Sequence, residues 1–448
     1  MNLQKLYDNK EYHKIIKKLK DKISNKEYDY ETFLYLSSAY FKIKNYNESI
    51  KYAKMGLLKY SNKFAFYQNL GISYLGLGMV DDAKRALLKA LELNPNINPQ
   101  VYTNLAKIYY FNREFFEAFE LFCKAKIKYP KDMSIDYDMS FYYLYLGEYL
   151  EAYDIYRVRY SLDNIHRKRK LPRYDILLDK DSDITNKQIL ISHEQGFGDS
   201  IQMVRFALLL KRLKAKKVYF QTPKVLARLY KYNFSKQIKI VDEEEKIGVH
   251  NFIPIMDLPY ILDIPSIDIP FNQGYMRVNK KESYEFYKSY FIDNGLLNIG
   301  IVFRGNPEHS NDEKRSIDSL EMIEYLEPII NRCNIYSLQY QPTKREKSIF
   351  KKYNIVDISS DFKDFYDTAL ALDNLDILIT VDTSVAHLAG AMNKKTLLLL
   401  PYFHDTRWGM DSKKTNWYSS ITLYKQDKSS NWKSLFGELV SDINKILV

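Results

Sequence analysis

The sequence predicts two parts: an all-α array of helical repeats, followed by an α/β module with two lobes. Three observations lead to this prediction. The first third of the chain repeats itself at a spacing of 34 or 35 residues. After residue 187, short apolar runs alternate with amphipathic stretches, which is typical of parallel strands connected by helices. This alternation occurs twice, and a chain of 448 residues is long enough for two or three domains.

Small residues recur at the same place in each repeat, where two helices must approach closely. Each repeat also carries a tyrosine beside the first of these positions, and prolines at 95 and 130 mark repeat ends. The two small-residue columns are Ser37, Gly71, Ala106 and Ser140, and then Ser49, Ala83, Ala118 and Ala152.

This unit resembles the tetratricopeptide repeat (TPR), a helix-turn-helix of about 34 residues. The resemblance covers residues 1–160 and implies a solenoid. The concave face of such a solenoid commonly holds an extended peptide or a partner protein. The alternative is that the array serves dimerisation or support, so a homo-oligomer remains open.

The rest of the chain divides at two changes of pattern. Residues 161–187 have a basic cluster, a proline and no apolar period, and we interpret them as a connector. Residues 188–283 form the predicted N-terminal lobe, and its proline-rich end, from residue 250 on, is expected to be irregular. Residues 284–448 form the predicted C-terminal lobe.

Composition narrows the class of protein. The net charge is +11, but acidic residues lie between the lysines and arginines, and no nucleic-acid-binding motif accompanies them. We therefore expect no nucleic-acid partner.

No signal peptide or membrane span is visible, so we expect a cytoplasmic protein. Cys123 and Cys333 have no CxxC partner or His cluster, which argues against a disulfide framework or a zinc site.

The first polar loop, HEQGFGDS, follows the first predicted strand of the α/β module. Gly196 and Gly198 would let the backbone come close to a ligand, and Asp199 would begin the next helix. The alternative is a plain turn in which Asp199 only caps the helix. His193, Glu194 and Gln195, just before the glycines, are candidate contacts to an acceptor or a donor.

Two further loops leave predicted strands of the second lobe. The loop at residues 303–317 carries Arg304, Asn306 and Arg315, and arginine forks suit phosphate oxygens. Gln339 ends the strand NIYSLQ, where it would read a base or ribose edge or simply cap the strand.

The fourth loop gives the strongest signal. The apolar strand DILITV runs into Asp382, Thr383 and Ser384 and then into a small-residue helix. Free amides and hydroxyls at a helix N-terminus favour an anion. His387, one turn into the helix, would face the same ligand or lie satisfied under the sheet edge.

Five segments in this order resemble glycosyltransferase family 9, the ADP-heptose transferases. They are HEQGFGDSIQMVRF, GNPEHSNDEKRSI, SLQ, DFKDFYDTALALDNLDILITVDTSVAHLAGAM and PYFHDTRWGMDSKKTNWYSSITLYKQ. The resemblance implies a GT-B architecture, in which two Rossmann-like lobes face a cleft. It also implies a bacterial protein, a nucleotide-sugar substrate, inversion at the anomeric carbon, and no metal or other cofactor.

The resemblance also implies roles for the loop residues. Asp199 occupies the place of the family's proposed base, and Asp382, Thr383, Ser384 and His387 match its donor-binding DT-x-x-x-H motif. Arg315 falls where the family has a phosphate-binding lysine, and Gln339 falls at an acidic position of its nucleotide pocket. These two departures leave the nucleotide and the sugar open.

Three functions follow from these expectations. The first is a glycosyltransferase whose acceptor, a protein, is recruited by the repeats. The second is a glycosyltransferase that acts on a lipopolysaccharide or other glycan. The third is a non-catalytic TPR scaffold with a decayed GT-B domain.

Overall fold

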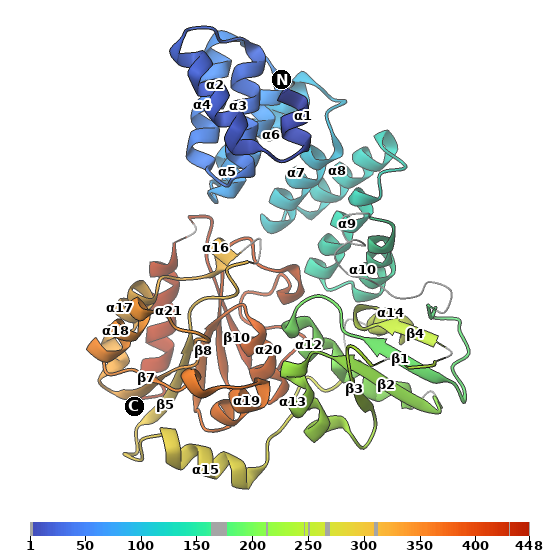
Figure 1. Cartoon of the computed structure of the whole chain (residues 1–448), viewed down its shortest axis with the longest axis vertical. Coiled ribbons are helices and arrows are strands. Elements are labelled where there is room, and N and C mark those ends of the chain that lie inside the picture. Colours follow the sequence, from blue (N-terminus) through green and yellow to red (C-terminus); the bar gives the residue numbers. More distant parts are fainter. Residues whose placement is uncertain are drawn as a thin grey trace. The chain divides into compact units, whose positions relative to one another are not determined.

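A computed structural model describes residues 3–162, 177–211, 214–245, 247–249, 251–264, 269–308, 312–429 and 431–447. Its contacts divide the chain into two compact units (Figure 1). The first unit comprises Met1–Tyr142 with Lys428–Ser430, and the second comprises Tyr143–Asp427 with Asn431–Val448. Residues 163–176, which include most of the predicted connector and its basic cluster, lie outside the described residues.

The first unit consists of antiparallel helix pairs, drawn in blue and cyan in Figure 1. Consecutive helices pack on one another, as α5 on α6 and α7 on α8. The helices are α1 (Leu3–Asp8), α2 (Tyr12–Ser24), α3 (Tyr30–Lys42), α4 (Tyr46–Lys59), α5 (Phe64–Gly76), α6 (Val80–Leu93), α7 (Pro99–Phe111) and α8 (Phe115–Lys128). The next helix, α9 (Met133–Leu146), spans the division between the units.

The small-residue columns lie inside this packing, as predicted. A Cβ on Gly71 would come within 2.5 Å of the Leu87 side chain, so the approach of α5 to α6 requires glycine there. Ser49 donates a hydrogen bond to the carbonyl of Ser37 at 2.8 Å, and both serines are fully buried. The columns therefore set the distance between neighbouring helices.

The second unit begins with α10 (Tyr149–Tyr156) and the short 3-10 helix η1 (Arg157–Ser161). The predicted repeat region reaches residue 160, whereas the contacts assign α10 and η1 to the same unit as both sheets. The segments that follow build two parallel sheets of four and six strands, so the predicted fold class is confirmed.

The first sheet has the order β3-β2-β1-β4, and all its strands are parallel. Sequence analysis missed its last strand, because the proline-rich segment after residue 250 contributes an edge strand that ends at Pro254, and edge positions tolerate proline. The elements are β1 (Gln188–Ser192), α12 (Phe197–Ala207), η3 (Leu208–Lys211), β2 (Lys217–Thr222), α13 (Lys224–Phe234), β3 (Lys239–Asp242), β4 (Asn251–Pro254), η4 (Ile255–Asp257) and α14 (Leu258–Ile261).

The second sheet has the order β10-β9-β8-β5-β6-β7, also fully parallel. After α15 (Lys280–Tyr290), its elements are β5 (Leu297–Val302), α16 (Asp312–Arg315), α17 (Ser319–Ile330), β6 (Cys333–Ser337), α18 (Lys344–Lys352), β7 (Val356–Asp357), η5 (Ser359–Asp361), α19 (Phe365–Asp373), β8 (Ile377–Val381), α20 (Ser384–Ala391), β9 (Thr396–Leu400), η6 (Thr406–Trp408), β10 (Ile421–Lys425) and α21 (Trp432–Asn444).

The strand orders place the predicted loops. In each sheet, the side on which successive strands are added changes beside the first strand. This change lies between β1 and β4 in the first sheet and between β5 and β8 in the second. Ligands of doubly wound sheets bind outside the carboxyl ends of the strands at such a reversal. The loops after β1, β5 and β8 are three of the four that the sequence singled out, and the fourth, with Gln339, follows β6.

Candidate functional site

Asp199 lies in the first turn of α12 and is largely buried. Its Oδ2 accepts a hydrogen bond from the backbone N–H of Gly196 at 2.8 Å, which closes the turn before the helix. Gln195, just before that turn, has a left-handed φ of 68°. Asp199 therefore stabilises its own loop, and its Oδ1 is left for other contacts.

The residues before the glycines are anchored by the segment that precedes the sheet. Arg159 of η1 is fully buried and donates hydrogen bonds to both carboxylate oxygens of Glu194, at 2.9 and 3.0 Å. The same guanidinium contacts Asp257, which follows β4, at 2.6 Å. Gln195 donates to the hydroxyl of Tyr156. Glu194 and Gln195, two predicted ligand contacts, thus have internal partners in this structure.

Gly198 is the point where two helix starts meet. A Cβ there would come within 2.7 Å of Cδ2 of His387 and 3.4 Å of the Cα of Ser384. The absence of a side chain at position 198 is therefore what lets the N-termini of α12 and α20 pack together. The glycine loop and the fourth predicted loop are brought into direct contact.

His387 is held rigidly at this junction. Its Nδ1 lies 3.0 Å from the hydroxyl of Tyr418, and its ring stacks on Trp408 with centroids 5.2 Å apart. Burial lowers the pKa of His387 well below its usual range, and the nearby charge of Arg407 adds to this effect. The imidazole is therefore neutral at pH 7, and its contacts favour the interpretation of a satisfied histidine.

Arg407, in η6 after β9, contacts α12 of the first sheet's lobe and Asp405 of its own lobe. Its Nη2 lies 2.7 Å from Oδ1 of Asp199, and its Nε lies 3.0 Å from Oδ1 of Asp405. Its Nη1 donates to Oε1 of Gln202 at 2.8 Å. Sequence analysis gave Arg407 no role, although it stands in the PYFHDTRW segment of the family resemblance.

Asp382 and Asp405 differ in their protonation because their surroundings differ. Burial, together with the charge of Asp405, raises the pKa of Asp382 from 3.8 to about 6. Burial also acts to raise the pKa of Asp405, but its ion pair and hydrogen bonds with Arg407 outweigh burial and lower that pKa to about 2. Arg407 therefore faces one firmly ionised carboxylate and one that titrates near neutral pH.

The start of α20 leaves a polar atom without a partner. Thr383 occupies the position before the first helical residue, Ser384, but its hydroxyl does not cap the helix. The Oγ1 of Thr383 is buried and makes no hydrogen bond to any described residue. A hydroxyl and the free amides of the first turn of α20 are thus available to an anion.

Arg315 ends α16, which follows β5, and its side chain contacts the loop after the neighbouring strand β8. Its Nη1 donates to the backbone carbonyl of Asp382 at 2.9 Å, and its Nε lies 3.1 Å from Oδ1 of Asp312. This places Arg315 beside the loop after β8.

The other predicted residues of the second lobe have internal partners. Oε1 of Gln339 accepts from the backbone N–H groups of Phe303 and Arg304 at 3.3 and 3.0 Å, which favours its role as a strand cap. The guanidinium of Arg304 pairs with both oxygens of Glu346, at 2.8 and 3.2 Å. Asn306 is exposed, and its side chain accepts from the N–H of Glu308 in a local turn.

His193 lies just before the glycine loop, with its ring 6.2 Å from that of Phe197. Burial lowers the pKa of His193, and the charges of Asp199 and Glu194 partly oppose this shift. Its Nδ1 is buried without a hydrogen bond to any described residue. It is the one predicted residue of this loop whose side-chain nitrogen remains unsatisfied.

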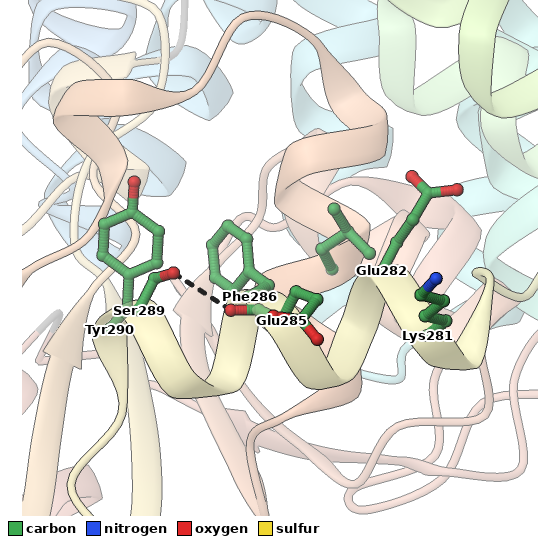
Figure 2. A pocket seen from close by; sticks show the side chains of 7 residues that line it. Lys281, Glu282, Glu285, Phe286, Ser289 and Tyr290 are labelled. Atoms are coloured by element: carbon green, nitrogen blue, oxygen red, sulfur yellow. Dashed lines mark hydrogen bonds between the residues drawn. The ribbon is translucent and has the colours of Figure 1, made fainter.

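A separate hollow lies along α15, away from these loops. It has a volume of about 490 Å³ and is lined mainly by one helix face, where Ser289 donates to the carbonyl of Glu285 at 3.0 Å (Figure 2). It contains none of the predicted site residues, so its size alone does not make it the candidate site. Leu370 of α19 completes the lining formed by Lys281, Glu282, Glu285, Phe286, Ser289 and Tyr290.

The described residues contain neither a membrane-spanning helix nor a cluster of metal-ligating side chains. None of the described helices has the length and apolar character needed to cross a bilayer. Within the same residues, no group of three or more His, Cys, Asp and Glu side chains is arranged to hold a metal ion.

Comparisons with known proteins concern the helical part. The tetratricopeptide repeat family model matches residues 64–97, which contain α5 and α6. The crystal structure of MamA is 21% identical over 38% of this chain and 98% of that chain, with a TM-score of 0.32. A thermophilic TPR protein of Thermus thermophilus is 17% identical over 37% of this chain and 92% of that chain, also with a TM-score of 0.32. No curated protein matches the chain. Residues 64–97 are therefore a tetratricopeptide repeat, and they lie within an N-terminal helical repeat array.

Proposed function

We propose that the α/β unit is a GT-B glycosyltransferase that moves a sugar from a nucleotide-sugar donor to an acceptor, with inversion and without a metal or other cofactor. The observation that carries the proposal is the meeting of two loops at Gly198, where the carboxylate of Asp199 and the anion-favouring start of α20 belong to one site. A base for the acceptor hydroxyl and a cradle for the leaving diphosphate are the two groups that such a reaction needs.

Asp199 takes the proton of the acceptor hydroxyl in this mechanism. The hydroxyl oxygen then attacks the anomeric carbon, and the bond from that carbon to the diphosphate oxygen breaks. The free amides of α20, the Thr383 hydroxyl and Arg315 stabilise the charge of the diphosphate as it leaves. His387, neutral and fixed by Tyr418, orders the start of α20.

The acceptor in this proposal is a protein presented by the repeats, because tetratricopeptide repeats commonly bind peptides and proteins. A glycan acceptor is the competing assignment. Transfer to candidate proteins and to free glycans by the full chain distinguishes them, since each predicts a labelled product of a different class.

The non-catalytic alternative has one observation in its favour. Arg304 and Gln339, two residues expected to contact the donor, make hydrogen bonds to Glu346 and to the backbone of the chain. A decayed site would leave its side chains in such internal contacts. This alternative predicts that no nucleotide sugar is turned over.

The test measures nucleoside diphosphate released from ADP-, UDP- and GDP-sugars by the wild type and by two variants. Asp199→Asn removes the proposed base and should lower the rate by about 100- to 10,000-fold. Asp367→Asn is the matched control, because Asp367 also lies in the first turn of a helix and also pairs with an arginine, Arg228, at 2.8 Å. Equal rates for Asp199→Asn and the wild type would rule out the assignment of the base.

A further inference from the structure

Arg407 has more donors than its present contacts use. Its side chain is only 17% exposed. Of its five N–H groups, one on Nη1 donates to Gln202 and that on Nε pairs with Asp405 at 3.0 Å. Nη2 approaches Oδ1 of Asp199 to 2.7 Å, yet Oδ1 is buried without a hydrogen bond in hydrogen-bond geometry to any described residue. The contact is an ion pair outside hydrogen-bond geometry, so another oxygen can compete for Nη2.

Two other polar groups lie in the loops beside Arg407, and one of them is unsatisfied. Trp408, next to it in η6, is 1% exposed, and its indole N–H lies close to the carboxylate of Asp382. The Oγ1 of Thr383 has no hydrogen bond to a described residue. Buried polar groups in folded proteins nearly always find partners, so the unmet hydroxyl of Thr383, beside a loop in which Oδ1 of Asp199 has only an ion pair, indicates a site for a polar ligand.

The ligand of such a site is an anion with several oxygens. Arg407 carries a permanent positive charge and a planar fork of donors, which suits phosphate. The first turns of α12 and α20 converge beside it and present the positive ends of two helices. A carboxylate offers two oxygens to these donors, whereas a diphosphate offers several.

We propose that Arg407 binds the diphosphate of the donor and that this diphosphate displaces Asp199 from Arg407. This inference rests on the proposed function for the identity of its ligand. Without ligand, Asp199 neutralises Arg407. When the diphosphate binds, Nη2 turns to a phosphate oxygen, and the Oδ1 of Asp199 becomes free to accept the proton of the acceptor hydroxyl.

This exchange fixes the order in which the donor binds and the base becomes available. Asp199 becomes available as a base only after the donor has bound, so the acceptor hydroxyl is activated only beside a donor. Asp405 keeps its contact with Nε throughout and holds the guanidinium in place. Arg407 is therefore a ligand-binding residue that also controls the proposed base.

Calorimetry with inorganic pyrophosphate tests the exchange on the full chain. The wild type should bind pyrophosphate. Arg407→Gln should weaken binding by about 10- to 100-fold, since a charge-assisted hydrogen bond is lost, and Arg407→Lys should retain part of the affinity. Asp199→Asn should tighten binding severalfold, because the competing anion has been removed.

Arg228→Gln and Asp367→Asn are the matched controls, since Arg228 and Asp367 form an ion pair at 2.8 Å elsewhere in the unit. Neither should change the affinity for pyrophosphate. The tightening by Asp199→Asn separates ligand exchange from misfolding, because a damaged site does not bind more tightly.

Three results would overturn the inference: no binding of pyrophosphate by the wild type, wild-type affinity in Arg407→Gln, or unchanged or weaker binding in Asp199→Asn. The proposed function fails by a different result, the absence of nucleoside diphosphate release with every donor. Arginine-dependent binding that tightens in Asp199→Asn would stand even if no sugar were transferred.

Discussion

At the scale of residues, Gly198 is the position where a small change has the largest expected effect. Gly198→Ala places a methyl group 2.7 Å from Cδ2 of His387, and His387 cannot move freely because it stacks on Trp408 and bonds to Tyr418. Overpacking of this kind costs about 1–3 kcal/mol. We expect the melting temperature of the second unit to fall by several degrees in thermal unfolding followed by circular dichroism.

Gly196→Ala is the control for that change. A Cβ at position 196 would contact only Oδ2 of Asp199, at 3.2 Å, and alanine in place of this N-cap glycine should cost no more than about 1 kcal/mol. Equal effects of the two substitutions would contradict the assignment of Gly198 to helix packing.

Asp382 gives a prediction about pH. Its pKa in the folded protein is raised to about 6, from 3.8, so folding favours its protonated form. This contribution to stability is fully present below about pH 4 and is lost as the pH rises through about 6. Asp382→Asn should therefore gain stability relative to the wild type between about pH 4 and about pH 6.5, measured as the difference in melting temperature. A difference that is constant with pH would contradict the raised pKa.

Several of these residues could be recognised from the sequence, and others could not. Asp199 and the Asp382–His387 segment were found because each follows an apolar strand and opens a helix, a pattern that short windows reveal. Arg407 was missed because it lies in an irregular loop, and its partners Asp199 and Gln202 are more than 200 residues earlier in the chain. The only available signal was its place in the family-like segment PYFHDTRW.

At the scale of elements, η1 and the glycine loop depend on each other. Arg159 is fully buried between the carboxylates of Glu194 and Asp257, which follow β1 and β4 respectively. The Arg159 side chain therefore lies at the carboxyl ends of β1 and β4, where the strand order of the first sheet reverses. Separations of 35 and 98 residues between these partners explain why sequence patterns did not reveal the cluster.

Arg159→Met should destabilise the second unit strongly. The substitution leaves the buried carboxylate of Glu194 without a cation and leaves Asp257 with Arg157 alone, at 3.3 Å. Breaking a buried ion pair by removing one partner costs about 3–5 kcal/mol. Adding Glu194→Gln and Asp257→Asn to Arg159→Met should restore much of the loss. Thermal unfolding of the wild type, the single variant and the triple variant measures both effects, and a triple variant no more stable than Arg159→Met would contradict this account.

At the scale of the whole molecule, the contacts indicate where the α/β unit begins. Tyr149 of α10 lies 5.2 Å from Trp417 between ring centroids, and Tyr156 and Arg159 hold the glycine loop. The sequence pattern assigned these residues to the repeats, because the repeat period continues through Ala152. The repeat period shows that two neighbouring helices form a pair. The compact unit to which a helix belongs depends instead on its contacts with residues far away in the sequence.

Truncation tests this division. A chain that starts at Tyr143 should keep the cooperative unfolding of the second unit, whereas one that starts at Leu162 should lose it, because α10 and η1 are removed. Circular dichroism melting curves of the two truncated chains provide the comparison. Equal stability of the two would show that α10 and η1 do not belong to the unit.

The central claim is that the loops after β1 and β8 form one site for sugar transfer, with Asp199 as its base. Nucleoside diphosphate release from ADP-, UDP- and GDP-sugars tests it most directly. We predict turnover with at least one donor, a fall of about 100- to 10,000-fold in Asp199→Asn, and no change in the control Asp367→Asn. No release with any donor, or a wild-type rate in Asp199→Asn, would contradict the claim.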